Sequence, residues 1–268
     1  MPKLTTNPFS GCFIALEGGD GSGKTTQTLL LAEALQKEDY PILHTFEPTK
    51  DLRFGKLVRS IYTSANLPTE LPTSLVQFFA DEGYYVFRRH TEKSQKKYLD
   101  LFEKIAHDLS LGNYGELPHF IQLCMTFDRM DHRAYIEVPA LNEGTHVISD
   151  RDFFSTLAYG MSEGIPFQTL LDMQKYILGV YAILPDLIIF LDTPIEIAAK
   201  RMAESRKNKE RFDDQLAAIY HAYREIIFNP QLYSLSTVVS IDGSMSPDTI
   251  HHFIMKAVKN ILQYGNKD

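Results

Sequence analysis

A glycine-rich run near the start of the chain has the residue types and spacing of a phosphate-binding loop. It fits the pattern G-x-x-x-x-G-K-[ST], in which glycines let the backbone curl around an anion and the following helix adds its positive end. The lysine of such a loop reaches the β- and γ-phosphates, and the hydroxyl after it offers a ligand to Mg²⁺. We therefore predict that ATP is bound by Gly18, Gly19, Asp20, Gly21, Ser22, Gly23, Lys24, Thr25 and Thr26.

The elements that must position this loop can be predicted from five short apolar runs separated by long helical patterns. Continuous apolar strands that alternate with helices are typical of a parallel sheet covered on both faces. Four of the runs end in an acidic residue or a glycine. Ligands bind outside the carboxyl ends of such strands, so the chemistry is expected there. The runs are Cys12–Gly18, Pro41–Glu47, Thr145–Asp150, Asp186–Asp192 and Thr237–Asp242.

Helical spacing of apolar residues predicts helices over Lys24–Gln36, Ile195–Glu204 and Thr91–Asp108. A last helix is expected from an N-cap at Ser246 to about Tyr264, and the glycines and proline of Leu111–Pro118 predict a loop. We expect a single α/β domain over residues 1–268, with a largely helical insert at 69–118 before the third strand.

Composition limits the function. The chain has 268 residues and a formal net charge of −7, which argues against general nucleic-acid binding because such proteins are usually basic. No apolar run is long enough to cross a membrane, and no signal peptide is apparent. The two cysteines, Cys12 and Cys124, suit a reducing compartment. We therefore expect a cytoplasmic protein that acts on small-molecule nucleotides.

The two acidic residues Asp20 and Asp150 are candidates, beside Thr25, for holding Mg²⁺ directly or through water. Asp150 could instead orient its neighbour Arg151, and both interpretations stay open. Neither carboxylate needs to act as a strong base, because phosphoryl transfer depends mostly on positioning and electrostatic stabilisation.

Taken together, the motifs along the chain resemble those of the thymidylate kinase family. The loop and its flanks match that family almost residue for residue, and further motifs follow in the family's order over about four fifths of the chain. They are Phe13–Gln27, Phe46-Glu47-Pro48, Leu123–Arg129, Ser149-Asp150-Arg151, the thymidine-site turn Ser155–Tyr159, Leu184–Asp192 and Lys200–Asp213.

The resemblance implies transfer of the γ-phosphoryl group of ATP to thymidine monophosphate, and a homodimer formed by helix packing. An anionic acceptor needs fixed positive charge, and the planar fork of arginine matches phosphate. Surface salt bridging is the alternative for the arginines, and burial in the core is the alternative for Tyr159. By resemblance, the acceptor is bound by Glu47, Pro48, Arg59, Met125, Arg129, Arg151, Thr156 and Tyr159.

A basic segment over 201–213 resembles the family's lid, which closes over ATP and excludes water. The family carries a catalytic arginine either in the phosphate-binding loop or in the lid. Here the loop has none, so the lid version is implied, with Arg206 as the first candidate and Arg211 as the second. A solvated, charged helix end is the alternative. Lys24 and Arg151 complete the predicted catalytic set.

Four departures from the family pattern surround the acceptor base. Met125 replaces an aromatic residue that stacks on thymine, Gly160 replaces a glutamine, and Phe46 replaces an arginine. The fourth is the insert at 69–118, which could cover the acceptor pocket, form a dimer contact or be inert. These departures leave open a kinase for another deoxynucleoside monophosphate or a deoxynucleoside. A non-catalytic, ATP-binding regulatory protein is the alternative from another functional class.

Overall fold

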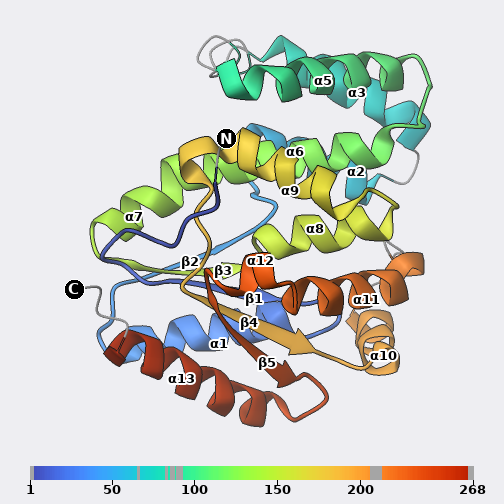
Figure 1. Ribbon diagram of the computed structural model, residues 1–268. Helices are drawn as coiled ribbons and strands as arrows, with labels where there is room; N and C mark the ends of the chain where they lie inside the picture. The colour runs from blue at the N-terminus through green and yellow to red at the C-terminus, as the bar shows by residue number, and fades with distance from the viewer. Residues whose placement is uncertain are drawn as a thin grey trace.

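The computed structural model describes residues 3–64, 67–81, 84, 88, 93–205 and 213–264. In these residues a parallel sheet of five strands, in the order β2-β3-β1-β4-β5, forms the centre of the molecule (Figure 1). The predicted fold class is confirmed, and each predicted strand lies within one or two residues of its expected bounds. The strands are β1 Phe13–Glu17, β2 Ile42–Phe46, β3 His146–Asp150, β4 Leu187–Asp192 and β5 Thr237–Asp242.

The strand register places the carboxyl ends of the first three strands together. Asp150 of β3 lies opposite Leu16 of β1 on one side and opposite Phe46 of β2 on the other. The phosphate-binding loop follows β1 directly, and helix α1 (Lys24–Lys37) follows the loop. The acidic ends predicted from the sequence therefore meet at one edge of the sheet.

Helices cover both faces of the sheet, as the apolar strands predict. Helix α1 and helix α13 (Pro247–Tyr264) pack on one face. Ile14, Ile189 and their neighbours supply the sheet side of that core. Ser246 accepts a hydrogen bond from the backbone N–H of Thr249, as expected of the N-cap of α13.

The other face packs against a larger group of helices, because alternate strand residues such as Ile188 and Phe190 point that way. Figure 1 shows this layer above the sheet. It contains α2 Arg53–Thr63, α6 Leu117–His132, α8 Phe153–Ser162, α9 Phe167–Leu178 and α11 Leu216–Ile227. Shorter or peripheral elements are the π-helix Arg133–Glu137, α7 Val138–Asn142, Gly179–Tyr181, α10 Ile195–Ser205, Asp213–Gln215 and α12 Pro230–Tyr233.

Helices α3 (Leu67–Ala80) and α5 (Lys93–Ser110) make up most of the predicted insert. Phe102 of α5 stacks on Phe120 of α6 with ring centroids 4.9 Å apart, and Phe78 of α3 contacts Phe54 of α2 at 5.1 Å. The insert therefore packs onto α2 and α6, away from the sheet, as Figure 1 shows.

Two local predictions need correction. The loop expected over Leu111–Pro118 ends earlier, because Leu117 already begins α6 with Pro118 in its first turn, where a proline costs no hydrogen bond. The thymidine-site turn expected at Ser155–Tyr159 is helical and lies within α8.

Candidate active site

The phosphate-binding loop connects β1 to α1 and depends on glycine at its last turn. Gly23 precedes α1 with φ of 96°, and Gly21 has φ of 75°, a region that other residues rarely adopt. A Cβ on Gly21 would lie 2.3 Å from the carbonyl oxygen of Ala198 in α10. The loop therefore keeps its shape only with glycine there, and α10 packs directly against it.

Lys24 lies at the start of α1 with its side chain buried inside the loop. Its Nζ donates to the carbonyl oxygen of Gly19 at 2.8 Å and to Oγ of Ser22 at 3.3 Å. Burial, together with the neighbouring charge of Arg151, lowers the pKa of Lys24 to about 8. A phosphate anion beside this ammonium group would offset both effects, so the site is poised to gain from binding one.

The predicted metal ligands are adjacent. The hydroxyl of Thr25 donates to Oδ2 of Asp150 at 2.5 Å, while Oδ1 of Asp150 is buried with no hydrogen-bond partner among the described residues. A hydroxyl and an unpartnered carboxylate oxygen are the hard ligands that Mg²⁺ prefers, so this pair fits the ion. Asp20 instead pairs with Arg151. No cluster of three or more candidate metal ligands occurs in the described ranges.

Arg151 follows β3 and crosses between the loop and the neighbouring pocket. It is one of the rare non-glycine residues here with a positive φ, 74°, a conformation that concentrates at functional sites. Besides its pairing with Asp20, its guanidinium lies 5.2 Å from the ring centroid of Tyr159 and 3.4 Å from Oγ of Ser155. It therefore lies between the loop and the acceptor side of the site.

A single pocket of about 400 Å³ joins the loop to the predicted acceptor residues. Helix α2 supplies Arg59, α6 supplies Met125, and α8 supplies Thr156 and Tyr159. The sequence-predicted residues in its walls are Asp20, Thr25, Glu47, Pro48, Arg59, Met125, Asp150, Arg151, Thr156 and Tyr159.

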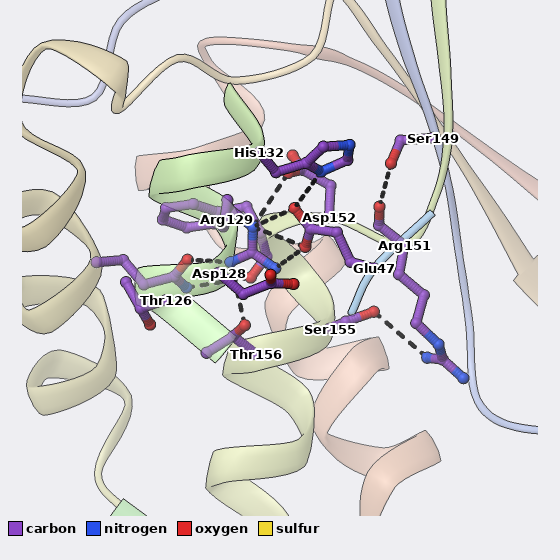
Figure 2. A network of polar contacts seen from close by, with 12 residues as sticks. Glu47, Thr126, Asp128, Arg129, His132, Ser149, Arg151, Asp152, Ser155 and Thr156 are labelled. Carbon is purple, nitrogen blue, oxygen red and sulfur yellow. Dashed lines mark hydrogen bonds and ion pairs between the residues drawn. The ribbon is translucent and has the colours of Figure 1, made fainter. Parts of the chain in front are cut away.

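Arg129 is different, because the structure places its side chain behind the pocket wall. It is fully buried and pairs with Glu47, Asp152 and Thr156, as Figure 2 shows. Burial alone would raise the pKa of Glu47, but Arg129 and His132 lower it. The predicted acceptor contact of Arg129 therefore needs revision, since the guanidinium is occupied by protein partners.

Glu17 holds the start of α8 in place. Its carboxylate accepts hydrogen bonds from the backbone N–H of Asp152 at 2.9 Å, from Oγ of Ser155 at 2.7 Å and from the hydroxyl of Tyr223 at 3.0 Å. Burial raises its pKa to about 7. Glu17 therefore acts on the pocket through Ser155, which is itself a wall residue.

Several pocket residues were not singled out from the sequence. A spacing signal exists for Gln122, which is three residues before Met125 and so on the same face of α6. The others carry no sequence signal, because they reach the pocket only through the fold. They are His44, Lys50, Tyr62 and Thr63.

Comparisons with known proteins agree with this geometry. The family model for thymidylate kinase matches two overlapping stretches, residues 16–102 and 75–254. The chain belongs to the thymidylate kinase family.

Individual relatives cover nearly the whole chain. A probable thymidylate kinase of Thermococcus gammatolerans is 32% identical over 95% of this chain and 99% of its own length. A probable thymidylate kinase of Pyrococcus horikoshii is 31% identical over 94% and 98%. A thymidylate kinase of Pelotomaculum thermopropionicum is 27% identical over 95% of both chains.

Two predictions for a thymidylate kinase lid fall outside the described residues, namely Arg206 and Arg211. The described start of this segment does reach the loop. Nη1 of Arg201 in α10 lies 3.4 Å from the carbonyl oxygen of Ser22 and 3.5 Å from that of Gly21.

In the part of the chain that the structure describes, no helix is long and apolar enough to cross a membrane.

Proposed function

We propose that this chain transfers the γ-phosphoryl group of ATP to thymidine monophosphate, giving the diphosphate and ADP. The observation that carries the proposal is the single pocket in which the loop residues Asp20 and Thr25 share a wall with Arg59 and Met125 of the acceptor side. A donor phosphate and an acceptor phosphate bound there would be neighbours, and proximity of this kind supplies much of the rate in phosphoryl transfer.

The roles of the charged groups follow from their positions. Lys24 and the loop backbone hold the β- and γ-phosphates, and Arg151 aims the acceptor phosphate while it stabilises charge on the transferred group. Thr25 and Asp150 would hold Mg²⁺, which would supply positive charge to neutralise the donor phosphates. Arg206 or Arg211 completes the charge stabilisation from the lid.

A coupled assay of ADP release across the nucleoside monophosphates tests the proposal. Turnover is expected with thymidine monophosphate, and a rate at the ATP-only background would overturn the assignment. Arg151→Ala separates the alternative acceptors, because a deoxynucleoside has no phosphate for this arginine to bind. A raised KM for the acceptor with ATP binding retained would support a monophosphate acceptor, whereas an unchanged acceptor KM would favour a nucleoside.

Two further parts of the proposal concern the location of the protein and its oligomeric state. The two cysteines Cys12 and Cys124 suit a reducing cytoplasm, and the family resemblance implies a homodimer. Light scattering of the purified chain tests the second point directly, since a mass near 30.6 kDa would show a monomer instead.

A further inference from the structure

Gln122 lies in the wall of the acceptor pocket with its amide unused by the protein. The residue is 1% exposed, and neither its amide nitrogen nor its amide oxygen has a hydrogen-bond partner among the described residues. Buried polar groups nearly always find partners. Because Gln122 also lines the pocket, its buried, unpartnered amide points to a ligand that completes it.

The position of Gln122 on α6 supports this interpretation. Gln122, Met125 and Arg129 are spaced three and four residues apart, so they lie along one face of the helix. Met125 offers an apolar surface for a flat ring, but no hydrogen bond to its edge. Arg129 is occupied by Glu47. Among these three, Gln122 alone has free donors and acceptors for a bound base.

The glycine at position 160 stands where the family pattern has a glutamine, so this chain lacks that amide. A Cβ there would lie 2.6 Å from the side chain of Leu170 in α9, so a longer side chain would have to displace Leu170 between α8 and α9. The chain thus lacks the glutamine that the family pattern places at this position, and it buries a different glutamine in the pocket wall from α6.

We propose that Gln122 binds the hydrogen-bonding edge of the acceptor's pyrimidine base; the inference rests on the proposed function. Thymine presents an N3–H donor beside an O4 acceptor. A primary amide complements this pair, because its oxygen accepts from N3–H while its nitrogen donates to O4. A site built to hydrogen-bond its substrate rejects analogues that lack the matching groups, because its own polar atoms are then left unpaired.

The test combines a protein change with a substrate change. The substrates are thymidine monophosphate and its 2,4-difluorotoluene isostere, which keeps the shape of thymine but pairs weakly. In Gln122→Leu we expect kcat/KM for thymidine monophosphate to fall roughly tenfold to a hundredfold. The isostere should change by less than about threefold, and KM for ATP should stay constant.

Stability separates this role from a structural one. Since the Gln122 amide has no hydrogen-bond partner among the residues that the structure describes, Gln122→Leu should keep or raise the melting temperature. Gln174 is the matched control, because it is equally buried but fully bonded to Arg129 and to the backbone of Phe153. Gln174→Leu should lower the melting temperature. Gln122→Met serves as a second variant of similar length.

The results distinguish a failure of this inference from a failure of the proposed function. If both Gln122 variants leave the ratio of the two substrates unchanged, the inference is wrong while the proposed function stands. Equal losses on both substrates with a lowered melting temperature would also overturn it, by showing a structural role. Absence of any turnover of thymidine monophosphate by the unchanged protein would overturn the proposed function, and this inference with it.

Discussion

Replacing Arg129 by methionine should lower the stability of the protein strongly and should change the affinity for the acceptor little. Methionine keeps the length of the side chain but removes its charge and its hydrogen bonds. The guanidinium pairs with Glu47 and Asp152 and donates to Thr156 at 3.0 Å and to Gln174. All of these partners are buried, so the loss of the arginine leaves buried carboxylate charge without its cation.

The size of the effect follows from the charge that is left behind. Removing one partner of a buried ion pair costs about 3–5 kcal/mol, because the other charge stays buried without compensation. A chain of this size loses about 2–4 °C of melting temperature per kcal/mol, so Arg129→Met should lower it by roughly 6–20 °C. Adding Glu47→Gln removes the stranded charge and should restore part of the loss.

The measurement is thermal unfolding of both single variants and the double variant, with kinetics recorded well below each melting temperature. The reasoning predicts a large loss of stability, partial recovery in the double variant, and a KM for thymidine monophosphate within a few-fold of the unchanged protein. Stability within about 1 kcal/mol together with a steep rise in that KM would refute it. That result would restore Arg129 as a direct acceptor ligand.

Three other perturbations have defined outcomes. Since the pKa of Lys24 is lowered to about 8, this group must take up a proton to bind ATP at higher pH. The ATP affinity should therefore fall by at most about tenfold per pH unit above that value, and calorimetric titration from pH 7 to 9.5 would show a flat profile if this is wrong. Burial lowers the pKa of His132, but the carboxylates of Glu137 and Glu47 outweigh it and raise the value to about 9. A raised pKa stabilises the fold fully below the unfolded value of about 6.5 and no longer above the folded one. The melting temperatures of the unchanged protein and His132→Gln should thus converge between pH 6 and pH 9.5, and a constant gap would contradict this. Gly160→Ala gains about 0.5–1 kcal/mol from helix propensity but places a Cβ 2.6 Å from Leu170, an overpacking that costs about 1–3 kcal/mol. Net destabilisation in urea unfolding, relieved by Leu170→Val, is expected, and stabilisation by the alanine would show that α9 yields freely.

The central fold could be predicted because its signals are local. Each strand of a covered parallel sheet is a continuous apolar run, and the run Cys12–Gly18 leads directly into the glycine loop. Helix α3 had no comparable signal, since Pro72 lies inside it and proline argues against a helix interior. Leu71, Leu75 and Phe78 belong to the same hydrophobic core as residues of α2 and α5. This packing outweighs the preference against proline.

In the candidate site too, residues within local motifs could be predicted, and residues that depend on distant partners could not. The phosphate-binding loop and Arg151 could be proposed from the sequence, because each belongs to a motif of consecutive residues. The burial of Arg129 could not, because Glu47 and Gln174 are 82 and 45 residues away in the chain. Whether an arginine faces a ligand or a buried carboxylate depends on partners that only the tertiary fold brings together.

Helix α6 connects the insert to the acceptor pocket through its two faces. With 3.6 residues per turn, Phe120 and Phe127 lie roughly opposite Gln122, Met125 and Arg129. The phenylalanines pack against Phe102 of the insert, at 4.9 Å and 6.0 Å between ring centroids.

No described residue of the insert lines the pocket. The described part of the insert therefore stabilises the acceptor wall from behind and does not cover the pocket. For the described residues of the insert, this packing argues against the role of a cover, and the other two roles stay predictions. It also places the insert's influence on the acceptor side, because the donor loop is held by α1 and α10 instead.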